Sequence, residues 1–307
     1  MRASLATRQV IVLSNERDFA ADGVIARMRL AGVDIVRINS EDRPTVPDWS
    51  PSQQAASQPA IWWRQFIPEE APTRSVLELD DRLVIGEQWR AWISVFDAPG
   101  TFWMNPIWSA RSAENKVNQL RIASFCGFDV PPTLVTNSAT SARSFSHNVG
   151  PCIVKTLRAG YFAYSDSAFM FTRRLTSEIL DMDEWEQQPI IVQARIEPRI
   201  DIRLFVVHGA VVGAASTKTP HDTDDWRTVS HEVEWSPWSV PASIAAACID
   251  YTRRFNLEYC AFDFASDDER IWFLEGNQAG EFSFLDRPLE LGIGSAIANT
   301  LAGLVLD

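Results

Sequence analysis

The residues that decide the fold read YCAFDFASDDERIWFLEGN, positions 259–277. Two apolar runs joined by the polar turn 266–270 predict a β-hairpin. Side chains alternate along a strand, so Glu275 and Asn277 share one face of the second strand, and Asp263 on the first strand can face the same way. Two carboxylates and an amide oxygen suit a hard cation such as Mg²⁺, which takes its other ligands from water and from a nucleotide's phosphates. The hairpin therefore indicates phosphoryl chemistry.

Length and charge limit the class of protein. At 307 residues the chain exceeds one average domain, which favours two or three subdomains around one cleft. The net charge of −12 argues against non-specific binding to nucleic acid or to anionic membranes, because such binding needs a basic face. The N-terminal apolar run is too short for a signal or membrane-spanning segment. We expect a cytoplasmic protein with no nucleic-acid or membrane partner, and a homodimer is compatible with the sequence.

Cysteine and histidine usage excludes some kinds of site. The four cysteines are widely spaced, lie in apolar contexts and form no CxxC pair, which favours buried, reduced thiols over zinc ligands or disulfides. The four histidines show no metal-ligand spacing and no paired nucleophile, so neither a zinc site nor a catalytic triad is expected. The cysteines are Cys126, Cys152, Cys248 and Cys260.

The N-terminal part, residues 1–110, is predicted to be an α/β domain. A strand at 10–13, a helix at 18–31 and a strand at 34–38 form a βαβ opening. It lacks the G-x-G-x-x-G turn, so dinucleotide binding at its first loop is not supported. The elements expected after it are a loop, an aromatic strand, a helix and a short strand, at 44–59, 61–66, 76–96 and 102–105.

Two further parts are predicted, at 111–190 and 191–307. The first begins with a helix at 113–125 that stops at Gly127, and it contains a strand at 151–156 that carries Lys155. The last part is rich in strands and closes with a helix. Its predicted elements are strands at 190–196, 201–207 and 210–215, the hairpin, and a helix at 286–303. The fold class is therefore α/β with α+β subdomains.

Polar residues then follow a definite order along the chain, with cations and a hinge first and metal ligands last. They are Lys116, Lys155, Gln193, Arg203, Lys218, Arg227, Asp263, Glu275 and Asn277. This order resembles that of the ATP-grasp carboxylate–amine ligases. More closely, it is similar to the microviridin-type graspetide ligases, which cyclise ribosomal peptides through ester or amide bonds between side chains.

The resemblance covers nearly the whole chain, and several short segments carry it together. These are IWWR at 61–64, Asn115-Lys116-x-x-Gln119-Leu120, VPPTL at 130–134, DIR at 201–203, DWR at 225–227 and FLEGN at 273–277. It implies an ATP-grasp fold with an N-terminal Rossmann-like domain, a central nucleotide-gripping subdomain and a C-terminal β-rich catalytic subdomain. It also implies ATP and Mg²⁺ as cofactors and a ribosomal precursor peptide, with leader and core, as the partner.

The resemblance assigns roles to residues on the nucleotide side. Asp263, Glu275 and Asn277 would hold Mg²⁺, although the two carboxylates could instead be outward-facing hairpin residues. The nucleotide would be bound by Lys116, Lys155, Gln193, Ala194, Arg195, Ile196, Asp201 and Arg203. The family often has glutamate where this chain has Ala194, so Glu197 or Asp201 is left to hold the ribose hydroxyls. Asn277-Gln278 replaces the familiar Asn-Pro. Either lysine could also be a solvated surface residue.

Three cations are assigned to catalysis. Arg203 lies in an apolar run, where burial without an anionic partner is costly, which favours phosphate contact over a structural salt bridge. Lys218 and Arg227 flank the acidic loop 221–225, and the resemblance places them by the acyl phosphate and the incoming substrate. That loop could meet a basic or Ser/Thr-rich peptide, or be a solvated turn. Most of the twelve tryptophans are expected in the core or at subdomain interfaces, and Trp226 with Trp235 could form an aromatic wall for a leader peptide.

The leading hypothesis is an ATP-dependent ligase. It would phosphorylate Asp or Glu side chains of a precursor peptide and let a Ser/Thr hydroxyl or Lys amine attack, which gives a macrolactone or macrolactam, ADP and phosphate. The second hypothesis is an amino-acid or glutamate ligase that resembles the ribosomal-protein-modifying or glutathione-forming enzymes. The third is a non-catalytic nucleotide- or peptide-binding module, against which the retained set of polar residues argues.

Overall fold

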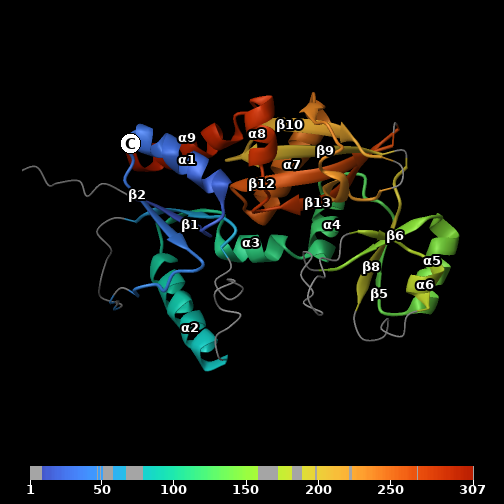
Figure 1. The fold of residues 1–307 in the computed structure, drawn as a ribbon, viewed down its shortest axis with the longest axis horizontal. Helices are drawn as coiled ribbons and strands as arrows, with labels where there is room; N and C mark the ends of the chain where they lie inside the picture. Colours follow the sequence, from blue (N-terminus) through green and yellow to red (C-terminus); the bar gives the residue numbers. More distant parts are fainter. Residues whose placement is uncertain are drawn as a thin grey trace, which may run out of the picture. The chain divides into compact units, whose positions relative to one another are not determined.

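The computed structural model describes residues 9–46, 48, 50, 58–66, 79–157, 172–181, 189–197, 199–220, 223–267 and 269–306 (Figure 1). The chain forms two compact units. One contains Met1–Trp108, Asn256–Tyr259 and Ala279–Asp307, and the other Ser109–Phe255 and Cys260–Gln278. The C-terminal segment thus belongs with the N-terminal unit. The three-part division at residues 110 and 190 stays a prediction.

The N-terminal unit is built on a parallel sheet. Its strand order is β2-β1-β3-β4, with bounds Val10–Ser14 for β1, Ile35–Asn39 for β2, Ala60–Trp63 for β3 and Phe102–Met104 for β4. Every residue of β1 is buried, as a central parallel strand requires. The predicted βαβ opening is confirmed. The aromatic strand predicted at 61–66 ends at Trp63, because Gln65 adopts a left-handed φ of 43°.

Helices complete this unit. They are α1 Phe19–Leu30, α2 Leu79–Phe96, α8 Ser283–Leu289 and α9 Ile293–Leu306. One closing helix was expected at 286–303, but the chain breaks after α8. There Glu290 adopts a left-handed φ of 51°, and the Asp286 carboxylate accepts hydrogen bonds from the first backbone N–H groups of α9. The tryptophans Trp89, Trp92 and Trp103 lie in the core cluster, which is where most tryptophans were expected.

The second unit contains two sheets. The five-stranded sheet has the order β11-β10-β9-β12-β13, with bounds Ser236–Pro237, Ala210–Lys218, Ile200–Val207, Tyr259–Ser266 and Ile271–Asn277. The four-stranded antiparallel sheet has the order β5-β8-β6-β7, with bounds Thr133–Thr136, Ile190–Ala194, Cys152–Lys155 and Arg173–Arg174. Phe128 packs against Phe262, Phe264 and Phe273 on the larger sheet. The predicted hairpin at 259–277 is confirmed.

Helices of this unit flank the sheets. They are α3 Ile107–Ala113, α4 Lys116–Phe125, α5 Ala139–Val149, α6 Ser177–Leu180, α7 Ala242–Phe255 and the 3₁₀ turn η4 Trp226–Val229. The helix predicted at 113–125 is confirmed from Lys116 to Phe125, but its start lies later than predicted, because α3 ends at Ala113 and Asn115 caps α4 by accepting from the Asn118 N–H at 3.0 Å. The break places Lys116 in the first turn of α4, next to β13. Helices α5, α6 and α7 were not predicted.

The described residues also test the predictions about cysteines and membrane-spanning segments. All four cysteines are free, and three of them are buried. Among the described helices none is by itself long and apolar enough to cross a membrane, and α8 with α9 reaches that length only across a bend of 106°.

Candidate active site

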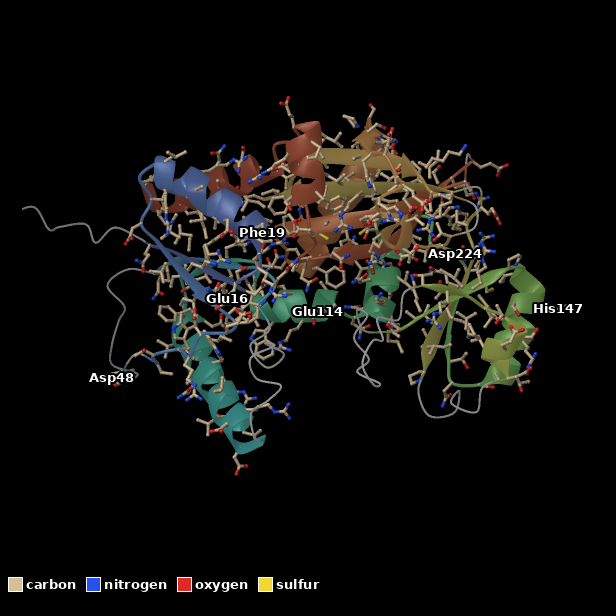
Figure 2. All side chains as sticks on the ribbon, viewed as in Figure 1. Glu16, Phe19, Asp48, Glu114, His147 and Asp224 are labelled. Atoms are coloured by element: carbon tan, nitrogen blue, oxygen red, sulfur yellow. The ribbon has the colours of Figure 1, made fainter. Side chains whose placement is uncertain are left out.

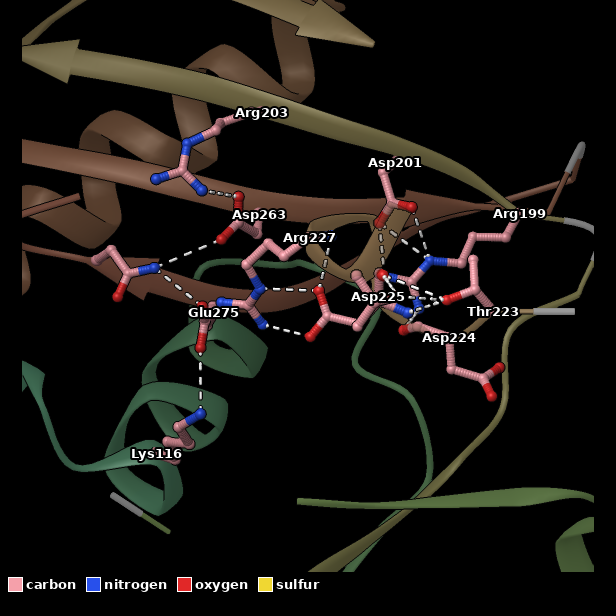
Figure 3. A network of polar contacts seen from close by, with 12 residues as sticks. Lys116, Arg199, Asp201, Arg203, Thr223, Asp224, Asp225, Arg227, Asp263 and Glu275 are labelled. Carbon is pink, nitrogen blue, oxygen red and sulfur yellow. Dashed lines mark hydrogen bonds and ion pairs between the residues drawn. The ribbon is translucent and has the colours of Figure 1, made fainter. Parts of the chain in front are cut away.

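The hairpin brings the three candidate metal ligands together. Asp263 on β12 lies directly opposite Glu275 on β13, and the Asn277 Nδ2 donates to Glu275 Oε1 at 2.9 Å and to Asp263 Oδ2 at 3.4 Å (Figure 3). The register shifts beside Asp263, so Leu274 is an extra residue on β13 and forms a β-bulge. Bulges re-aim the side chains next to them, and here the bulge precedes Glu275.

Each carboxylate has its own cation. Arg203 Nη1 lies 2.7 Å from Asp263 Oδ1, and Lys116 Nζ lies 3.2 Å from Glu275 Oε2. Burial raises the pKa of Asp263 to about 6, with Arg203 opposing that shift. Burial also acts on Glu275, but the charges of Lys116, Arg227 and Lys155 hold its pKa well below its usual range. The two side chains keep 16% and 17% of their surface exposed, so a ligand can still reach them.

Lys155, at the end of β6, adds positive charge without a partner. It is partly buried and makes no hydrogen bond or ion pair with any residue that the structure describes. Burial, followed by the charge of Lys116 and smaller contributions from Arg199 and Arg227, lowers its pKa to about 7, while the charge of Glu275 opposes this shift. Cations that repel one another in this way are stabilised when a polyanion enters among them. A nucleotide's phosphates have that charge.

Arg203 is only 6% exposed and forms a salt bridge with Asp263. The sequence left two interpretations of Arg203, phosphate contact and a structural salt bridge. The structure shows a salt bridge to a carboxylate of the same chain. That partner is itself a candidate metal ligand, so the guanidinium lies at the edge of the proposed phosphate site. Phosphate contact by Arg203 stays a prediction.

Arg227 is held by its neighbour. Its Nε and Nη2 donate to the two carboxylate oxygens of Asp225, both at 2.8 Å, and Asp225 is 3% exposed. This bidentate pair orients the guanidinium. The charges of Asp263 and Glu275 act on Arg227, which places it beside the candidate metal ligands (Figure 3).

The acidic loop is engaged within the chain. Asp224, labelled in Figure 2, accepts from Arg174 Nε at 2.9 Å and from Arg195 Nε at 2.5 Å, and it is 9% exposed. Its carboxylate thus joins β7 and the end of β8 to the loop that carries Asp225. Asp224 and Asp225 are thus paired with arginines of the same chain, so their carboxylates are not available to bind a basic peptide. His221 and Asp222 lie outside the described residues.

Several polar groups of the predicted hinge, residues 193–196, already form hydrogen bonds within the chain. Gln193 is fully buried and donates to Thr133 Oγ1 at 2.8 Å, while its Oε1 has no hydrogen-bond partner among the described residues. The backbone N–H groups of Ala194 and Arg195 donate to the carbonyls of Pro132 and Pro151. Ile196 follows as a partly buried residue.

Of the two residues left for the ribose, Asp201 is buried and already accepts from Arg199 and Thr219. The Glu197 side chain is 42% exposed, so Glu197 is the better candidate. Lys218 ends β10 as an exposed residue and forms no ion pair with a described residue.

Gln119 and Arg199 are site residues for which the sequence predicted no role. Gln119 contacts the backbone of Gly276, between two candidate metal ligands. The spacing of Gln119 from Lys116, three residues on one helix, is the signal that could have identified a shared face. Among the described residues no three His, Cys, Asp or Glu side chains cluster as a metal site, so the candidate set is two carboxylates and one amide.

The fold and the group of cations around two carboxylates agree with an enzyme of the ATP-grasp class, and comparison with known proteins gives the family. The model of the RimK-like ATP-grasp domain matches residues 113–301. The chain belongs to the RimK-like ATP-grasp family, which confirms the sequence-based assignment to ATP-grasp proteins.

Solved structures share the fold over almost the whole chain. The macrocyclase MdnC from Microcystis aeruginosa MRC, bound with precursor peptide MdnA, has a TM-score of 0.82 at 24% identity and covers 96% of this chain and 99% of its own. A RiPP-associated ATP-grasp ligase from Chryseobacterium gregarium has a TM-score of 0.82 at 22% identity, with 96% and 97% covered. The ATP-grasp ligase PsnB, complexed with minimal precursor, Mg and ADP, has a TM-score of 0.76 at 20% identity, with 96% and 97% covered. No curated protein sequence gives a significant match.

Proposed function

We propose that this protein is an ATP-dependent ligase that activates Asp or Glu side chains of a ribosomal precursor peptide as acyl phosphates and closes ester or amide macrocycles. The observation that carries the proposal is the pair Asp263 and Glu275, joined by the Asn277 amide, with Arg203 and Lys116 paired to the two carboxylates. The fold neighbours support the choice of substrate, since MdnC is bound with a precursor peptide and the Chryseobacterium gregarium ligase with ADP and a leader and core peptide.

The donor set fits Mg²⁺. Two carboxylates provide hard oxygen ligands, and the Asn277 amide now turns its Nδ2 toward both of them. A half-turn of that amide presents its oxygen instead. When bound, the metal would neutralise charge on the nucleotide's phosphates and on the transferred group.

The chain's own residues would supply the remaining stabilisation. A substrate carboxylate attacks the γ-phosphorus and ADP leaves, so two anions must approach each other. Lys116 and Lys155 would hold the nucleotide phosphates. Arg203 and Arg227 would stabilise the charge on the acyl phosphate, from fixed positions that need no rearrangement during the reaction. A hydroxyl or amine then attacks the acyl carbon. Phosphate leaves with one oxygen of the original carboxylate, and the nucleophile loses a proton.

A groove lined by residues of α3 and α4 supports an acidic peptide substrate. The groove encloses about 500 Å³, and its lining includes Arg111 and Arg121. Neither arginine forms an ion pair with a residue that the structure describes. In a chain of net charge −12, an acidic peptide needs such a local excess of positive charge. We infer that acidic residues of the precursor contact this groove.

The test begins with a search of the neighbouring open reading frames for a short peptide rich in Thr/Ser and Asp/Glu, which is then incubated with the protein, ATP and Mg²⁺. The proposal predicts a mass loss of about 18 Da per bond formed and release of ADP, because attack at the γ-phosphorus leaves the β-phosphate on the nucleotide. A mass gain equal to one amino acid would instead support the alternative amino-acid ligase. Formation of AMP, or ATP turnover that no peptide or amino acid stimulates, would overturn both.

A further inference from the structure

Strand β13 has a backbone edge without a neighbouring strand at the point where it carries the candidate metal ligands. It is the outermost strand of the five-stranded sheet, so only one of its edges pairs with β12. The bulge at Leu274 further loosens the pairing immediately before Glu275. Backbone N–H and C=O groups along such an edge need partners, and a strand without them can shift or fray. Something must therefore fix β13 between Glu275 and Asn277.

The side chain of Gln119 performs this role. Its Nε2 donates to the Gly276 carbonyl at 3.1 Å, and its Oε1 accepts from the Gly276 N–H at 3.2 Å. One amide group thus satisfies both backbone groups of one residue, as a neighbouring strand would. Nε2 also donates to the Ala113 carbonyl at 2.5 Å, so Gln119 joins the end of α3 to β13. It is 4% exposed, which protects these hydrogen bonds from water.

Two other contacts fix the same segment. On the far side of the bulge, the Phe273 N–H donates to the Asp129 carbonyl at 2.8 Å, so the bulge lies between two anchors on the outer edge. Beneath the strand, a Cβ on Gly276 would lie 2.9 Å from the Tyr251 hydroxyl, so only glycine fits there. Gly276 is therefore held from the edge and from the core.

The helix that carries Gln119 also carries a phosphate-site lysine. Lys116 lies three residues earlier on α4 and contacts the Glu275 carboxylate, while Gln119 contacts the next residue's backbone. One turn of α4 thus fixes the position of Lys116 relative to strand β13. Catalytic and metal sites require such placement to within about half an ångström.

We propose that Gln119 is a positioning residue that clamps strand β13 and so places Glu275 and Asn277 for Mg²⁺ and Lys116 for the nucleotide. This inference rests on the proposed function for its effect on turnover. The clamp itself is a property of the chain without any ligand, which allows it to be tested separately.

The decisive variant is Gln119→Met, which keeps the volume and loses every hydrogen bond. Loss of partners for a buried N–H and two carbonyls predicts that exchange of the Gly276 amide hydrogen becomes about tenfold or more faster, measured by hydrogen exchange on the ligand-free protein. Gln119→Glu can still accept from Gly276 N–H but cannot donate to either carbonyl, so it should fall between wild type and Gln119→Met. Ser124→Ala, at an exposed position on the same helix, is the matched control and should behave as wild type.

The second readout is the Mg²⁺ concentration that gives half-maximal peptide cyclisation. We expect it to rise about tenfold or more in Gln119→Met, with part of kcat restored at saturating Mg²⁺. If Gly276 exchange is unchanged, the clamp is refuted. If exchange rises but the Mg²⁺ requirement does not, Gln119 only stabilises the fold and the positioning role is refuted. Should wild type fail to cyclise any peptide, the proposed function fails while the exchange measurement still decides the clamp.

Discussion

Lys155 makes nucleotide binding depend on pH in a way that the structure allows to be calculated. Its pKa of about 7 in the ligand-free protein is far below the ordinary 10.5, because the site is buried and shared with Lys116, Arg199 and Arg227. Bound phosphates would favour the charged ammonium and raise that pKa again. Binding above pH 7 must therefore take up a proton, and affinity must fall as pH rises.

The magnitude follows from the charged fraction. With a pKa of about 7, half of Lys155 is charged at pH 7 and about 1% at pH 9, so nucleotide affinity should fall about 50-fold over this range. Phosphate groups titrate near pH 6 and Asp263 at about 6, so both keep their charge over this range. The expected proton uptake at pH 8 is close to one per nucleotide.

Isothermal titration with MgADP in buffers of different ionisation enthalpy measures both quantities. Lys155→Arg is the matched control, because a guanidinium stays charged at every pH used and should remove the dependence. An equal affinity at pH 7 and pH 9 in wild type, or proton release on binding, would refute the reasoning. So would a pH dependence that persists unchanged in Lys155→Arg.

Four further outcomes are expected. Asp263→Ala or Glu275→Ala should abolish ATP-dependent turnover with little loss of melting temperature, and near-normal activity of both would remove the metal-site assignment. Arg203→Ala should lower kcat/KM by about 10²-fold or more, as loss of one electrostatic donor does, whereas a loss that only tracks melting temperature would make it structural. Because Mg²⁺ requires an ionised Asp263, metal affinity in the nucleotide-free protein should fall as pH drops below about 6, and titration calorimetry from pH 7 to 5 would show the opposite slope if this is wrong. The double change Arg111→Ala with Arg121→Ala should raise KM for the peptide several-fold and leave KM for ATP unchanged, and an unchanged peptide KM would exclude the groove.

Patterns local in sequence were predictable, and contacts between distant segments were not. The alternation in 259–277 predicted the hairpin and the shared face of Glu275 and Asn277, and the structure confirms both. Leu274 gives no sign of the bulge, because a bulge depends on how two strands pair. The end of the helix predicted at 113–125 was correct, but its start at Lys116 was recognisable only from the Asn115 cap.

The same limit applies to the roles of individual polar residues. The sequence left the acidic loop available to a peptide. In the structure Asp224 and Asp225 form ion pairs with arginines from β7, the end of β8 and η4. Asp201 was a candidate for the ribose, and the structure pairs it with Arg199. The partners of long charged side chains depend on which segments the fold brings together, and the order of residues in the sequence does not give this.

The measurement that tests the central claim most directly follows oxygen from the peptide. The precursor is prepared with ¹⁸O in its Asp and Glu carboxylates, treated with the enzyme, ATP and Mg²⁺, and both the peptide and the released phosphate are analysed by mass spectrometry. If the carboxylate is activated as an acyl phosphate, each ring bond formed transfers one ¹⁸O to phosphate and the nucleotide product is ADP. Unlabelled phosphate, or rings formed with AMP as the product, would contradict the account.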